Sequence, residues 1–258
     1  MTVGLVLSGG GMRGAAHIGV IKALEERGII VTHISGSSAG AIVGALHAYG
    51  CDWNDILKIF KSFQIIDISK YALGKPGFID VEKFYPLLNS YIIDDDFKAL
   101  KKSLYITATN VLNGELKIFN SGELIKPILA SAAFPGVFTP VKIDKSFFID
   151  GGVLNNFPVE PLISQCDVII GVYVDGVKNI KVQDLKHSYG VVERAFKLKS
   201  FREDSQKFRH CDVVISLKEL DGFSTFDKKH LDTIFNIGYK ATNVELNKNA
   251  LIKSKFGL

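Results

Sequence analysis

Residues 33–50 read HISGSSAGAIVGALHAYG, where a turn made almost entirely of small residues joins a short apolar run to a helix-like run. The apolar run VTHIS (31–35) predicts a short buried strand. The segment SAGAIVGALHAYG (38–50) predicts a helix that ends at its final glycine. A strand that passes through a tight turn directly into a helix is typical of an α/β fold with a parallel sheet.

This turn carries a chemical motif. Gly36, Ser38 and Gly40 fit the pattern G-x-S-x-G, which at a strand-to-helix junction is typical of a nucleophile elbow. The motif needs small neighbours because the turn is strained and the serine must project clear of its own backbone. The dipole of the following helix favours an oxyanion formed beside it. A serine here can instead cap the helix, and Ser37 is the candidate for that structural role.

A glycine-rich loop, SGGGMRG (8–14), lies near the start of the chain. It joins a predicted strand, TVGLVLS (2–8), to a predicted helix, AAHIGVIKALEERG (15–28). Gly9, Gly11 and Gly14 fit G-x-G-x-x-G, so the loop predicts an anion site at a helix N-terminus. A dinucleotide would need an acidic residue at the end of the next strand, and residues 36–40 contain none. An oxyanion hole and a tight connection without a ligand are the two interpretations left open.

A third turn, FFIDGGVLNNFP (147–158), places Asp150 directly after a hydrophobic run and before Gly151 and Gly152. The turn predicts either a simple hairpin or an acid held at a strand end beside the serine.

Six histidines are candidates for a Ser-His-Asp triad. Three lie in predicted helices or a strand, where a packed neutral imidazole is expected, and three follow Asp150 in the order that a triad allows. None of them lies in a glycine-rich loop, which disfavours the triad. The first three are His17, His33 and His47, and the last three are His187, His210 and His230.

The remaining pattern continues the alternation of strands and helices. Further strands are expected in 104–120 (a hairpin at Asn113-Gly114), 146–150, 167–175 and 212–216, and further helices in 53–63, 80–92, 123–134, 184–208 and 229–251. The 258 residues show no repeat or linker, so we expect a single domain over 1–258.

Bulk properties exclude several classes of protein. Hydrophobic residues make up 47% of the chain, which argues against disorder, and no apolar run is long enough to span a membrane. The first residues lack the basic region of a signal peptide, so we expect a cytoplasmic protein. The three cysteines show no metal-ligand spacing and are expected to be reduced thiols. A net charge of +4 is too weak to indicate nucleic-acid binding.

The glycine loop, the serine turn and the Asp-Gly-Gly turn, in this order, resemble the patatin-like phospholipase family. The matching blocks are LVLSGGGMRGAAHIGVIKALEERGI (5–29), ISGSSAGAIVGAL (34–46), ILASAAFPGVFTPV (128–141) and FFIDGGVLNNFPVEPL (147–162). The resemblance is weak over 52–103 and beyond 178. It implies a three-layer α/β sandwich with a mainly parallel central sheet.

The resemblance also implies the chemistry. Ser38 would be the nucleophile and Asp150 the general base of a dyad without a histidine. The oxyanion hole would come from the glycine loop, with Gly10 and Gly11 at its centre and Arg13 nearby. The full expected set is Gly9, Gly10, Gly11, Arg13 and Gly14 for the oxyanion hole, with the turn glycines Gly36, Gly40, Gly151 and Gly152. We expect neither a metal nor a cofactor.

The expected substrate is a phospholipid or another lipid ester. A broader esterase, thioesterase or acyltransferase using the same dyad is the alternative, and a non-catalytic lipid-binding module is the least favoured. The basic stretch 178–209 allows a peripheral contact with anionic lipid headgroups. Because Glu193, Glu203 and Asp204 dilute its charge, a solvated helix that packs its apolar residues on the sheet is the favoured interpretation. The basic residues are Lys178, Lys181, Lys186, Arg194, Lys197, Lys199, Arg202 and Arg209.

Overall fold

The computed structural model describes residues 1–63, 71–72, 74–185, 188–226 and 228–257. Lys186 and the triad candidate His187 lie outside these ranges. The described chain builds one eight-stranded sheet in the order β5-β6-β3-β2-β1-β7-β8, with β4 paired to β3. The strands are β1 (Val3–Leu7), β2 (His33–Gly36), β3 (Ser103–Asn110), β4 (Leu116–Phe119), β5 (Val141–Ile143), β6 (Ser146–Asp150), β7 (Val168–Tyr173) and β8 (Val213–Ser216).

The prediction of a mainly parallel sheet is confirmed. Neighbours from β3 through β2, β1 and β7 to β8 all run parallel, as strand–helix–strand connections require. The strands β4, β5 and β6 form an antiparallel edge beside β3. The hairpin expected at Asn113-Gly114 joins β3 to β4, whereas β5 was not predicted.

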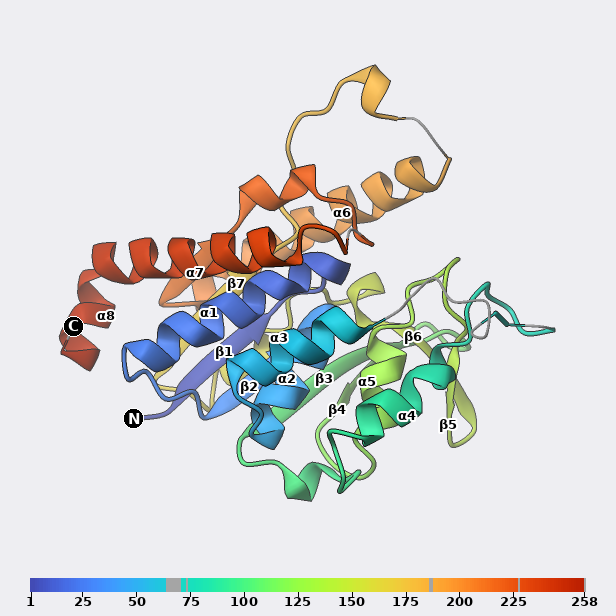
Figure 1. The fold of residues 1–258 in the computed structure, drawn as a ribbon, viewed down its shortest axis with the longest axis horizontal. Helices are drawn as coiled ribbons and strands as arrows, with labels where there is room; N and C mark the ends of the chain where they lie inside the picture. The colour runs from blue at the N-terminus through green and yellow to red at the C-terminus, as the bar shows by residue number, and fades with distance from the viewer. Residues whose placement is uncertain (64–70, 73, 186–187, 227, 258) are drawn as a thin grey trace.

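Helices cover both faces of the sheet, which gives the expected α/β sandwich. Figure 1 shows α1, α2 and α3 across one face, with α7 running alongside α1. The helices are α1 (Ala15–Glu26), α2 (Ala39–Tyr49), α3 (Trp53–Ser62), α4 (Tyr85–Asn89), α5 (Ile125–Ser131), α6 (Ser188–Lys207), α7 (Leu231–Lys248) and α8 (Ala250–Phe256).

Alternation along β1 separates two cores, because successive side chains of a strand point to opposite faces. Leu5 and Leu7 belong to the larger core under α1, α2 and α7, whereas Val6 belongs to a smaller core on the other face. Phe201, within α6, and Phe208, just after it, pack against that smaller core. The expectation for the stretch 178–209 holds only for its C-terminal part, because Val191 and Leu198 are about half exposed. Asp204 is 1% exposed and is not solvated.

Several predicted helices are shorter than expected, among them α5, which spans Ile125–Ser131 in place of 123–134. The region 80–92 begins as a 3-10 helix (Val81–Phe84) and continues as the short α4. The last helix breaks at Asn249, whose side chain accepts a hydrogen bond from the N–H of Ile252 and thereby caps α8. Among the described residues, no helix combines the length and the apolar character that crossing a bilayer requires.

Candidate active site

The elbow forms where β2 ends and α2 begins. Ser38 has φ 52° and ψ −122°, a conformation that non-glycine residues adopt only at a cost in free energy. The backbones pack so closely that a Cβ on Gly40 would lie 2.2 Å from the carbonyl oxygen of Leu7, and one on Gly36 would lie 2.6 Å from that of Gly40. The two glycines of the motif are therefore needed for close approach between β1, β2 and α2.

Ser38 and Asp150 are in direct contact. The Oγ of Ser38 donates a hydrogen bond of 2.7 Å to Oδ2 of Asp150. The other carboxylate oxygen, Oδ1, accepts a 2.7 Å hydrogen bond from the N–H of Gly152, which fixes the carboxylate plane. Gly151 is a second site of close approach, because a Cβ there would lie 2.3 Å from the carbonyl oxygen of Thr107.

The register of the sheet explains how Asp150 reaches the serine. Gly36, the last residue of β2, is opposite Ile106 of β3, and β3 then continues to Asn110. The antiparallel strand β6 pairs with this overhang, with Asp150 opposite Ala108. The C-terminal end of β6 therefore stops just beyond the end of β2, although β6 runs in the opposite direction.

Burial controls the protonation of Asp150, which is only 2% exposed. Desolvation raises the pKa of its carboxyl from 3.8 to about 7, although the hydrogen bonds from Ser38 and Gly152 act to lower it. The charge of Asp175 adds a smaller upward contribution. A carboxyl with this pKa is poised to accept a proton near neutral pH.

The residues of the glycine loop have different surroundings. The N–H of Gly9 donates to the carbonyl of Asn156 at 3.2 Å, and Gly14 packs its backbone against Ala39. The N–H groups of Gly10 and Gly11 donate to no described residue. Of the five expected oxyanion-hole residues, these two have backbone donors that are free within the described chain.

Arg13 lies in the same loop, and the Nη atoms of its guanidinium bond to distant segments of the chain. It is 1% exposed and is held by the carboxylate of Asp175, with Nη2 2.7 Å from Oδ1. The Nε of Arg13 has no hydrogen-bond partner among the described residues, so the expected part of Arg13 in the oxyanion hole stays a prediction. Ser37 differs from its expected role, because its buried Oγ has no partner among the described residues, and its backbone carbonyl accepts from the N–H of Gly40.

An apolar cavity opens in front of the serine. Aromatic rings line it, five of them in a chain with successive centroids 5.8–6.4 Å apart and two in a separate pair with centroids 5.3 Å apart. Ser38, Asp150 and the glycine loop lie at its polar end. The aromatic residues are Phe60, Phe63, Phe84, Phe134, Phe138, Phe196 and Phe226. Such a cavity can hold an alkyl chain with its polar end at the serine.

No described histidine lines the cavity. His17 is fully buried, and its ring Nε2 lies 2.8 Å from the carbonyl oxygen of Ser8. Burial lowers the pKa of both His17 and His47 to about 4. Within the described residues, there is also no cluster of histidine, cysteine and acidic side chains arranged to hold a metal ion.

Two residues near the serine were missed by the sequence analysis. The Oγ of Ser131, at the end of α5, accepts the backbone N–H of Ser38 at 2.8 Å and so supports the strained elbow. Asn156 lines the cavity and lies so close to the loop that a Cβ on Gly9 would be 2.3 Å from its Oδ1. Both belong to matching blocks, but nothing in the sequence marks them as neighbours of Ser38.

Residues 5–163 match the family model described as Patatin-like phospholipase. An uncharacterized NTE family protein of Mycobacterium tuberculosis (strain ATCC 25618 / H37Rv) is 35% identical over 180 residues, which cover 67% of this chain and 49% of that protein. Lysophospholipase NTE1 of Coccidioides immitis is 30% identical over 278 residues, covering 93% of this chain and 17% of that protein. The chain therefore spans about half the length of the mycobacterial relative and much less of the fungal one.

Among solved structures, VipD from Legionella pneumophila has a similar fold, with a TM-score of 0.61. The two share 19% sequence identity over an alignment that covers 96% of this chain and 67% of VipD. At this identity the likeness concerns the fold alone.

Proposed function

Because the chain belongs to the patatin-like phospholipase family, we propose that it is a serine lipid acyl hydrolase that works through a dyad of Ser38 and Asp150. The observation that carries the proposal is the 2.7 Å hydrogen bond from the Ser38 hydroxyl to a buried carboxylate at the end of an apolar cavity. The proposal treats residues 1–258 as one catalytic domain. Its substrate is a phospholipid, a lysophospholipid or another long-chain carboxylic ester.

The first half of the reaction transfers the acyl group. Asp150 takes the proton of the Ser38 hydroxyl as Oγ attacks the ester carbonyl carbon. The carbonyl oxygen becomes an oxyanion, which accepts hydrogen bonds from the N–H groups of Gly10 and Gly11. When the tetrahedral intermediate collapses, the ester C–O bond breaks and Asp150 returns the proton to the leaving alcohol. The acyl group remains on Ser38.

The second half releases the acid. The oxygen of a water molecule attacks the acyl-enzyme carbonyl while Asp150 accepts a proton from that water. The N–H groups of Gly10 and Gly11 then stabilise the second oxyanion. Breaking the bond to Oγ frees the fatty acid, and the proton on Asp150 returns to Ser38. A carboxyl with a pKa of about 7 is matched to both proton transfers near neutral pH.

The test is hydrolysis of a labelled phospholipid, a lysophospholipid and short p-nitrophenyl esters by the purified chain. Ser38→Ala is expected to lower turnover by about 10⁴-fold or more, and Asp150→Asn by about 10²–10⁴-fold. The matched controls are Ser205→Ala on α6 and the exposed Asp232→Asn on α7, which should both keep full activity.

The outcomes separate the candidate functions. Activity that survives Ser38→Ala contradicts the mechanism. Hydrolysis of short esters alone indicates a broader esterase. Failure of a fluorophosphonate to label Ser38 indicates a lipid-binding module.

A further inference from the structure

A segment far along the chain lies against the glycine loop. The carbonyl oxygen of Thr225 accepts the N–H of Met12 at 2.8 Å. Gly11 has φ 59°, and a Cβ at this position would lie 2.3 Å from the same carbonyl oxygen. The loop that carries the free N–H groups of Gly10 and Gly11 is therefore packed, backbone to backbone, against residues 223–226.

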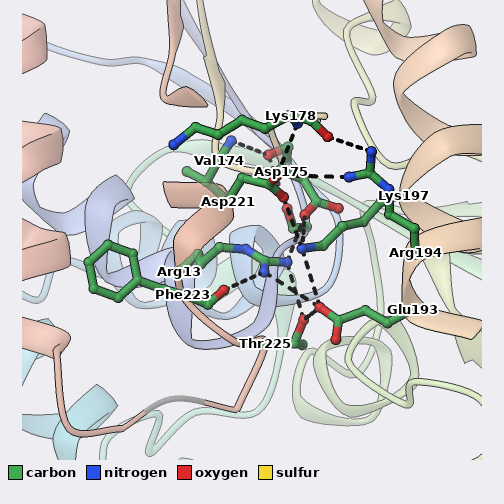
Figure 2. A network of polar contacts seen from close by, with 12 residues as sticks. Arg13, Val174, Asp175, Lys178, Glu193, Arg194, Lys197, Asp221, Phe223 and Thr225 are labelled. Carbon is green, nitrogen blue, oxygen red and sulfur yellow. Dashed lines mark hydrogen bonds and ion pairs between the residues drawn. The ribbon is translucent and has the colours of Figure 1, made fainter. Parts of the chain in front are cut away.

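Arg13 ties the same two segments together through its side chain. Its Nη1 donates to the carbonyl of Phe223 at 3.0 Å, and its Nη2 donates to Oγ1 of Thr225 at 3.2 Å. The same Nη2 donates at 2.7 Å to Oδ1 of Asp175, just after β7 (Figure 2). The fork of the guanidinium thus binds one strand end and one loop at once.

Helix α6 completes the assembly, which we call the buried ion network. The hydroxyl of Thr225 donates to Oε1 of Glu193, which also lies 3.6 Å from Nη1 of Arg13. The Nζ of Lys197 lies 3.3 Å from the same Oε1 and 3.4 Å from Oδ1 of Asp221 (Figure 2).

The charged groups of the buried ion network depend on one another for stabilisation, because little water reaches them. Asp175 is 5% exposed and Lys197 is 7% exposed, so their charges have little water around them. Desolvation raises the pKa of Asp175, and the charges of Arg13 and Lys197 act to lower it. Removing one partner of such a network leaves an uncompensated buried charge, which is strongly destabilising. The loop shares in this network, because Arg13 belongs to both.

We propose that Thr225 and Asp175 are positioning residues for the oxyanion hole, acting through Arg13 and Met12 to fix the N–H groups of Gly10 and Gly11. This inference rests on the proposed function. It assigns a task to residues outside the 5–163 family match, since Asp175, Glu193 and Thr225 all lie beyond it. Arg13 then holds the loop in place through its two Nη atoms.

Thr225→Val is the main test, because valine has nearly the shape of threonine, keeps the backbone carbonyl and loses the hydroxyl. We expect kcat on a p-nitrophenyl ester to fall by about tenfold to a hundredfold, with KM within about twofold, because oxyanion donors act in the transition state. Thr225→Ser restores the hydroxyl and should recover most of kcat. The matched control is Thr242→Val, a buried threonine whose Oγ1 bonds to Gly238 in α7.

A second readout is independent of activity. Thr225→Val should speed amide hydrogen exchange of residues 8–14 by about tenfold or more, because the loop loses a restraint. Thr242→Val should leave this exchange unchanged. If the wild type hydrolyses no ester, the proposed function fails while the exchange measurement still tests the positioning role.

Two results would overturn the inference. One is a Thr225→Val protein with kcat within twofold of wild type and unchanged exchange in residues 8–14. The other is a loss of activity that Thr225→Ser does not restore. If Thr225→Val does not fold, Glu193→Gln takes its place, because it removes the charge that accepts the Thr225 hydroxyl. The kcat and the amide exchange of residues 8–14 in Glu193→Gln then test the inference.

Discussion

The Ser38 hydroxyl and the Asp150 carboxylate lie 2.7 Å apart although 112 residues separate them in the chain. The serine comes from a strand-to-helix turn in the parallel part of the sheet, and the aspartate from the end of an antiparallel strand. Their contact depends on the overhang of β3 beyond β2. The same pairing of β6 with β3 buries the carboxylate of Asp150, and this burial raises its pKa.

The first prediction concerns the pH dependence of hydrolysis. Asp150 must be ionised to accept the serine proton, and its pKa is raised to about 7. We therefore expect kcat/KM to rise about tenfold per pH unit below about pH 7 and to level off above it. Steady-state kinetics between pH 5 and 9 measure this, and Asp232→Asn should keep the same midpoint. A profile that is flat down to pH 5 would contradict the assignment of Asp150 as the base.

The second prediction concerns stability. Because the folded pKa of Asp150 lies above its ordinary value of 3.8, folding binds a proton between these values, and burial of the carboxylate costs most above pH 7. Asp150→Asn removes that cost. We expect it to raise the free energy of unfolding more at pH 8 than at pH 5, by on the order of 2 kcal/mol. Urea unfolding at both pH values measures the difference, and equal effects at both would refute it.

The third prediction concerns the strained elbow. Glycine tolerates the Ser38 conformation, with its φ of 52°, better than alanine does. We expect Ser38→Gly to be more stable than Ser38→Ala by about 1 kcal/mol, with both inactive. At Ser103, in β3, we expect the opposite order of stability, with Ser103→Ala more stable than Ser103→Gly, because glycine weakens an ordinary strand. Chemical denaturation of the four variants tests this, and a Ser38→Gly protein less stable than Ser38→Ala would argue against strain.

The fourth prediction concerns the cavity. Ala132 lines it just after α5, so Ala132→Phe should fill part of its volume. We expect kcat/KM for long-chain esters to fall by about tenfold or more while acetyl esters change by less than about threefold, since only long chains need the filled volume. Ala250→Phe, at an exposed position in α8, should change neither. If long- and short-chain esters lose activity equally, the cavity does not hold the acyl chain.

Local patterns predicted most of the elements and the turns that carry the motifs. The run of small residues at 36–40 predicted the elbow, because a tight strand-to-helix turn needs such residues, and the strand–helix alternation predicted the parallel sheet. The boundary at Asn249 was missed because the apolar pattern continues across it, and β5 was missed because a three-residue strand carries almost no periodic signal.

The chain by itself determined which residues are chemically capable: a serine in an elbow, an acid at a strand end and a glycine loop. Each of these follows from contacts within a few residues. Tertiary structure decided their partners and their charge states. The raised pKa of Asp150 comes from burial, and the pairing of Arg13 with Asp175 joins segments 162 residues apart. Desolvation and ion pairing depend on what surrounds a group in space, and in this protein those surroundings come from distant parts of the chain.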